Sequence, residues 1–136
     1  MVAHLALFLL APWGAEGAAP VARQELKLHE VERNIVRWTN AERRRHGLEP
    51  LEVDPELMQS ARSHTAWMAR HHALRHTTRM VAENIAMGQR TSRQAVRSWM
   101  SSPGHRANIL SRSYRRIGVA AYKSPRGTIF WCQQFR

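Results

Sequence analysis

The side chains best suited to chemistry in this sequence are two histidines and a glutamate: His76 at the end of "HHALRH", Glu83 in "AENIA" and His105 in "SPGHRANIL". Imidazole and carboxylate groups transfer protons and bind metal ions. Their spacing alone does not bring them together, because they lie in different elements and no His-Glu-x-x-His helix holds them on one face. The chain has eight histidines, so on spacing alone the simpler interpretation of each is a surface or core residue.

The position of His105 favours an uncharged ring. Ser102 is placed to cap a helix and Pro103 to begin it, since proline lacks the N–H that would have no partner there. His105 then lies in the first turn, where the helix dipole contributes roughly half a positive charge and disfavours a protonated imidazole. We therefore expect a neutral imidazole at His105.

Two long helices are predicted ahead of these residues. Leu28, Val31, Ile35 and Trp38 share one helical face, and Gly47 ends that helix. After the connector "LEPLEVDP", Asp54 caps a second helix that begins at Pro55 and runs to about His71 or His72. The apolar face of the second helix comprises Leu57, Ala61 and Met68, with His64 among them. This placement favours a hydrogen-bonded packing histidine at His64 over a ligand.

The residue patterns in the second half of the chain predict two shorter helices and a small sheet. Thr91 and Gln94 form a Thr-x-x-Gln capping box for a third helix, and a fourth begins at Pro103. "RIGVAAYK" and "GTIFWCQQF" alternate like strands and are joined by the turn residues "SPRG", which predicts a C-terminal hairpin. A short strand near "VAENIA" should join it, because a lone hairpin is marginally stable. The order predicts an α+β domain.

The length of the chain predicts one domain, and its N-terminal residues predict an apolar leader. The 136 residues suffice for a single domain. Residues 1–19 contain the apolar run "LALFLLAPWGA" followed by small residues, which favours a signal peptide and a secreted or cell-envelope location. "MVAH" carries no Lys or Arg, so an apolar tail that packs on the domain is the alternative. No later segment has the length of a transmembrane helix.

The chain is strongly basic, with a net charge of +11 from 21 basic and 10 acidic residues. Such a surface attracts polyanions, including nucleic acid, anionic lipid or an acidic wall polymer. The alternative is a coding bias towards arginine with solvated charges. No recognition-helix, RNP-like or zinc-finger signature interleaves the arginines, so sequence-specific nucleic-acid binding is not predicted.

The single cysteine and four of the tryptophans are interpreted as packing residues. The single cysteine, Cys132, excludes an intramolecular disulfide and a thiolate metal cluster within one chain. The alternation of "TIFWCQQF" predicts that it is a small residue on a half-buried strand rather than a nucleophile. Trp38, Trp67, Trp99 and Trp131 are interpreted as core or cleft-wall residues.

Several motifs occur in the order and wording of a known family. They are "NAERRRHGLEPLEVDPEL", "ARSHTAWMA", "AENIAMG", "VRSWMSSPGHRANIL" and "RIGVAAY…IFWCQQF". From residue 28 to 136 the chain resembles bacterial members of the cysteine-rich secretory, antigen 5 and pathogenesis-related-1 (CAP) superfamily, the SCP-like extracellular proteins. The resemblance implies a three-layer α-β-α sandwich with a small antiparallel sheet.

The resemblance also implies a site. In this family two histidines and one or two acidic residues converge in a cleft, and the matching residues here are His76, Glu83 and His105. Some members bind a divalent cation there, and two imidazoles with a carboxylate and water match an open zinc site in ligand type. A neutral His105 is the form that such a ligand needs.

Two departures from the family pattern limit what the resemblance implies. Many eukaryotic members have a glutamate where Ser102 stands here, so the fourth polar group of the cleft is missing. The loop from His76 to Glu83 is short and "Ala-Glu-Asn-Ile" replaces the commoner "Gly-Glu-Asn-Ile", which implies a narrower cleft wall.

Three functions remain open at this point. The first is extracellular binding of an envelope ligand, which is a lipid, a peptide or a wall polymer, beside a divalent metal held by His76, Glu83 and His105. The second is a metal-assisted hydrolase that uses the same residues as catalytic groups. The third is polyanion binding through the arginines, which does not need the cleft. Whether the protein is an enzyme is left undecided.

Overall fold

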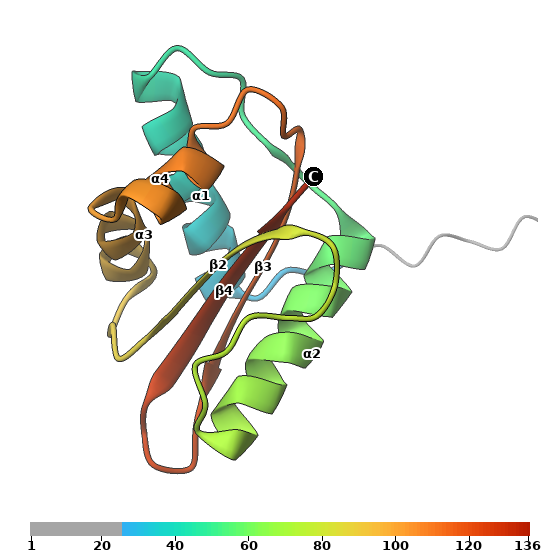
Figure 1. Cartoon of the computed structure of the whole chain (residues 1–136), viewed down its shortest axis with the longest axis vertical. Coiled ribbons are helices and arrows are strands. Elements are labelled where there is room, and N and C mark those ends of the chain that lie inside the picture. The colour runs from blue at the N-terminus through green and yellow to red at the C-terminus, as the bar shows by residue number, and fades with distance from the viewer. Residues whose placement is uncertain (1–25) are drawn as a thin grey trace, which may run out of the picture.

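Helices cover both faces of a four-stranded sheet (Figure 1). The computed structural model describes residues 26–136, and the predicted leader, residues 1–19, lies outside them. The elements in chain order are α1 (Glu30–Arg45), β1 (Glu52–Val53), α2 (Pro55–His71), β2 (Ala82–Met87), α3 (Ser92–Met100), α4 (Pro103–Ile109), β3 (Arg116–Lys123) and β4 (Ile129–Phe135). Because α2 lies on one face and α1, α3 and α4 lie on the other, the three-layer α+β sandwich is confirmed.

The strand order is β1-β3-β4-β2. The predicted hairpin is confirmed as the antiparallel pair β3–β4, and the predicted strand at "VAENIA" is confirmed as β2, antiparallel to β4. The fourth strand makes the sheet mixed, because β1 pairs parallel with β3 over Glu52 and Val53. The stretch predicted to be only a connector therefore holds a strand, which stays short because Asp54 caps the next helix.

The predicted helix starts are confirmed in place, with differences in their caps. Asp54 accepts hydrogen bonds from two first-turn N–H groups of α2, at 2.9 and 3.1 Å. Thr91 caps α3, but Gln94 bonds the N–H of Arg90 instead of that of Thr91, so only half of the capping box forms. Ser102 occupies the N-cap position of α4 without a side-chain cap bond.

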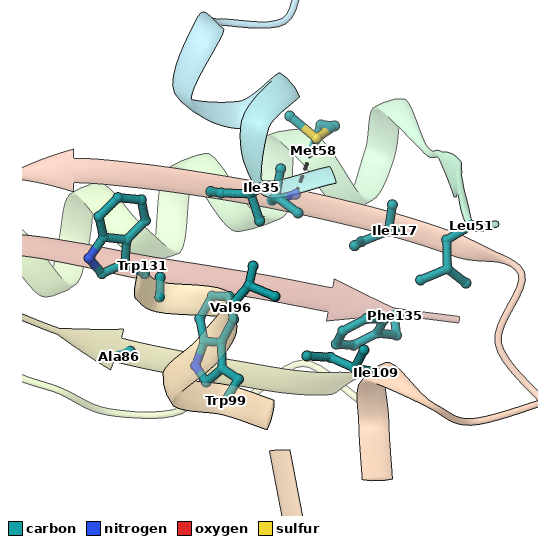
Figure 2. Close-up of a cluster of buried hydrophobic side chains, with 12 residues drawn as sticks. Ile35, Leu51, Met58, Ala86, Val96, Trp99, Ile109, Ile117, Trp131 and Phe135 are labelled. Atoms are coloured by element: carbon teal, nitrogen blue, oxygen red, sulfur yellow. Dashed lines mark hydrogen bonds between the residues drawn. The ribbon is translucent and has the colours of Figure 1, made fainter. Parts of the chain in front are cut away.

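Two hydrophobic cores flank the sheet. The larger one joins the sheet to α1, α3 and α4 and includes Trp99, Trp131 and Phe135 (Figure 2). The smaller one lies under α2 and includes Phe130 and Cys132. The prediction of a half-buried strand around Cys132 is therefore wrong, because β4 is central and helices cover both of its faces.

The N-terminal end of α2 lies close against β3. A Cβ added at Gly118 would overlap the backbone carbonyl group of Leu57, so this crossing requires glycine. The Met58 sulfur accepts the N–H of Val119 at 3.2 Å, drawn as a dashed line in Figure 2. These contacts hold α2 against the face of the sheet at β3. Among residues 26–136, no helix combines the length and hydropathy needed to cross a membrane.

Candidate functional site

Glu83 is the buried centre of the candidate site. It lies on the edge strand β2 with its side chain on the α2 side of the sheet, and it is 7% exposed. Its Oε1 accepts hydrogen bonds from His76 Nδ1 and from the Thr77 N–H, both at 2.9 Å. Its Oε2 accepts one from Gln134 Nε2 at 3.0 Å and lies 3.6 Å from the Cys132 sulfur. Both carboxylate oxygens are therefore occupied by donors from the protein.

This arrangement determines the tautomer of His76. Because Glu83 only accepts, Nδ1 of His76 carries the hydrogen, and the ring then presents Nε2 away from the carboxylate. The His76 side chain is 61% exposed, in the loop between α2 and β2. A histidine held by a carboxylate through one nitrogen is the usual arrangement of a metal ligand, with the other nitrogen free to bind.

His105 faces the same region from α4. It is the third residue of that helix and is half-buried. Burial lowers the pKa of His105 below its usual range, and the nearby charge of His76 lowers it further. The neutral ring expected from the sequence is therefore favoured here, by burial first and by His76 second.

Asn84 places α4 against the edge of the sheet. Its Nδ2 donates to the backbone carbonyl of His105 at 3.0 Å and to Gln133 Oε1 at 3.1 Å, while its Oδ1 accepts from Asn108 Nδ2 at 2.9 Å. Successive strand residues point to opposite faces. Glu83 therefore orients His76 on the α2 side, and Asn84 holds the helix of His105 on the other.

Four residues close to Glu83 were not predicted from the sequence as its partners: Thr77, Gln134, Cys132 and His64. The prediction of a hydrogen-bonded packing histidine at His64 agrees with its Nε2, which lies 2.6 Å from the Arg75 carbonyl, but the same atom is also 4.0 Å from Glu83 Oε2. The alternation of "TIFWCQQF" places Cys132 and Gln134 on one face of β4, which is the one signal that could have paired them.

Cys132 is not available as a nucleophile. It is fully buried, and burial together with the Glu83 carboxylate raises the pKa of its thiol well above the usual range. The thiol therefore stays protonated and points at Glu83. This agrees with the interpretation of Cys132 as a packing residue.

Two hollows open beside His64, and His76 lines one of them. The first has a volume of about 390 Å³ and contains Ser63 and Arg79 in its wall. The second, of about 360 Å³, contains Trp67 and His76. His64 and Thr77 line both.

The predicted site residues thus come together in part. His76 and Glu83 are in contact, and His105 is close enough for His76 to lower its pKa. Within residues 26–136, no three His, Cys, Asp or Glu side chains are grouped as a ready set of metal ligands. The site offers two imidazoles, one of them oriented by a buried carboxylate.

Comparison with known proteins agrees with this architecture. The cysteine-rich secretory protein family (CAP) matches residues 36–135. The uncharacterized protein YkwD of Bacillus subtilis is 34% identical over 142 residues, covering 92% of this chain and 54% of YkwD. The chain therefore spans about half the length of this relative.

Solved structures share the fold. An extracellular protein containing an SCP domain from Bacillus anthracis superposes with a TM-score of 0.69 at 26% identity, over 76% of this chain and 39% of that one. NaASP2 with Zn²⁺ superposes with a TM-score of 0.66 at 12% identity, over 79% of this chain and 80% of that one. The family resemblance of the motifs is confirmed, and this chain belongs to the cysteine-rich secretory protein (CAP) family.

Proposed function

We propose that this CAP domain acts outside the cytoplasm, secreted or at the cell envelope, and binds a divalent metal, zinc in the first place, at the cleft of His76, Glu83 and His105. The observation that carries the proposal is the hydrogen bond from His76 Nδ1 to the buried Glu83, which leaves Nε2 as the free nitrogen. The Bacillus anthracis relative is an extracellular protein, and NaASP2 has been solved with Zn²⁺, which supports the location and the metal.

The donor set offers zinc two imidazole ligands, one protein ligand fewer than an open zinc site usually has. His76 and His105 would supply imidazole nitrogens, and Glu83 would position His76, since both of its oxygens already accept protein hydrogen bonds. Water would occupy the positions that the two imidazoles leave open. A bound zinc ion would supply a positive charge beside the two hollows, where a lipid, peptide or wall-polymer ligand of the envelope would bind.

The test is zinc titration by calorimetry with single variants. We expect His76→Ala and His105→Ala each to weaken zinc binding by about tenfold or more, since each removes an imidazole ligand. His46→Ala is the matched control, because His46 is an exposed histidine at the end of α1, outside the cleft. Binding should also fall with pH through the histidine range, because protons compete for both rings. Equal binding by all three variants would overturn the proposal.

A metal-assisted hydrolase using His76, Glu83 and His105 is tested with the same proteins. Turnover of peptide or ester substrates by the zinc-loaded wild type, lost in His76→Ala, would make the cleft catalytic. Zinc binding without turnover would leave it a binding site.

A further inference from the structure

An arginine-lined groove lies between α1 and α3, away from the candidate site. It has a volume of about 300 Å³ and shares no lining residue with the two hollows beside His64. We call it the α1–α3 groove, and its lining residues are Trp38, Glu42, Arg45, Arg93, Val96 and Arg97. Three of these six residues are arginines.

The charges in the α1–α3 groove are not balanced. Its one acidic residue, Glu42, already pairs with Arg45 at 3.0 Å. Arg93 and Arg97 are exposed, and within residues 26–136 neither has a carboxylate at ion-pair distance. They lie one helical turn apart on α3, so they share a face and project the same charge.

Trp38 holds two arginines at this surface. The guanidinium carbons of Arg37 and Arg93 lie 4.9 and 4.8 Å from the centre of its ring. Stacking on an indole restrains a guanidinium group and leaves the N–H groups at its edge free to donate. These arginines are therefore already restrained before an anion binds, so binding costs them less side-chain entropy.

The chemistry of the groove favours phosphate. A guanidinium fork pairs with the two coplanar oxygens of a carboxylate, whereas the two non-bridging oxygens of a tetrahedral phosphate in a polymer accept from directions around each P–O bond, so a second arginine can share them. Because Arg93 and Arg97 line one groove together, a single phosphate can accept from both. The groove is concave, so a linear polymer can enter it, whereas a flat lipid surface cannot. We propose that the α1–α3 groove binds a linear phosphate-bearing polymer through Arg93 and Arg97, with Trp38 positioning Arg93 and Arg37.

The first experiment measures binding of inorganic polyphosphate at several salt concentrations. Arg93→Gln/Arg97→Gln should weaken binding by about tenfold or more at low salt and reduce the salt slope by about 1 for each lost phosphate contact. The control is Arg70→Gln/Arg126→Gln, which removes the same charge from exposed sites on α2 and in the hairpin turn. We expect a change of less than about twofold for it. Equal losses in both double variants, or no binding by the wild type at low salt, would overturn the proposal.

Two further variants separate stacking and geometry from charge. Trp38→Leu keeps every charge, so it should weaken polyphosphate binding while leaving the salt slope unchanged. Arg93→Lys/Arg97→Lys keeps the charge but removes the planar fork, so its affinity should lie between the wild type and the glutamine variant. Wild-type affinity in both would show that charge alone acts, contrary to the proposed positioning. Unfolding midpoints of all variants establish that the fold is intact.

The choice of polymer is tested with matched probes. Polyglutamate of similar charge should bind more weakly than polyphosphate, and equal affinity would overturn the assignment to phosphate. Poly(glycerol phosphate) and single-stranded DNA both contain phosphodiester groups. The polymer that binds with the higher affinity identifies the source of the phosphate that the groove recognises. His76→Ala should bind polyphosphate like the wild type, so this proposal and the zinc proposal fail independently.

Discussion

Glu83 has two roles at the scale of a single residue. It orients His76, and it is also the acceptor for the backbone of Thr77 and the side chain of Gln134. A buried donor that loses its acceptor retains the full cost of its desolvation. A variant of Glu83 therefore tests function only if these buried donors stay paired.

Glu83→Ala should lower the free energy of unfolding by about 2–4 kcal/mol, because it leaves Thr77 N–H and Gln134 Nε2 without acceptors. Glu83→Gln should lower it by about 1 kcal/mol or less. The amide Oε1 of Gln134 is buried without a hydrogen-bond partner, so this side chain can turn and accept from the new amide. Denaturant unfolding of both metal-free variants measures the difference. Equal destabilisation would contradict the proposed rearrangement.

At the scale of elements, the position of the candidate site depends on the caps and contacts that fix its helices to the sheet. Asp54 begins α2, the helix that carries His64, and it pairs with Arg136 at the end of the sheet. Burial acts to raise the pKa of Asp54, but hydrogen bonds from Leu57 N–H and Arg136, with the charge of Arg136, outweigh it and lower the pKa.

Asp54→Asn tests this cap through its pH dependence. A carboxyl group with a lowered folded-state pKa contributes stability above its unfolded value, near 3.8, and loses it as pH falls through the folded value. Asparagine still caps the helix but lacks the charge, so the variant should be less stable by about 1–2 kcal/mol at neutral pH. The gap to the wild type should narrow below about pH 4. Urea midpoints across pH measure it, and a constant gap would exclude the ionised group as its cause.

Trp99 fastens α3 to the sheet. It is 1% exposed, and its indole N–H donates to the Ile85 carbonyl at 3.1 Å. Trp99→Ala should cost about 3–5 kcal/mol through the cavity it leaves. His105→Ala should shift the melting midpoint of the metal-free protein only slightly, because Asn84 bonds the backbone of His105 and not its ring. If metal-free His105→Ala unfolds as readily as Trp99→Ala, His105 is a structural residue.

At the scale of the whole molecule, the net charge of +11 opposes folding. Like charges are closer in the folded state than in the unfolded chain, and salt screens them. We expect sodium chloride to raise the free energy of unfolding by an amount on the order of 1 kcal/mol between low and physiological ionic strength. Urea unfolding at several salt concentrations measures this. A decrease in stability with salt would show that ion pairs such as Arg62–Glu32 outweigh the repulsion.

The sequence by itself determined the four helices, the three antiparallel strands and the family. The caps at Asp54 and Thr91, the turn before β4 and the apolar periodicities are local signals, because each depends on residues within a few positions of one another. The motifs around His76, Glu83 and His105 identified the family and selected the candidate site. The leader, the role of these three residues and the metal remain predictions.

Only the tertiary structure decided how the site is built. Gln134 meets Glu83 from 51 positions away, and Asn84 bonds the carbonyl of His105 from 21 positions away. The parallel pairing of β1 and the double burial of β4 also follow from helices packing on both faces of the sheet. No spacing in the chain encodes these contacts, because they depend on which strands become neighbours and which face each helix covers.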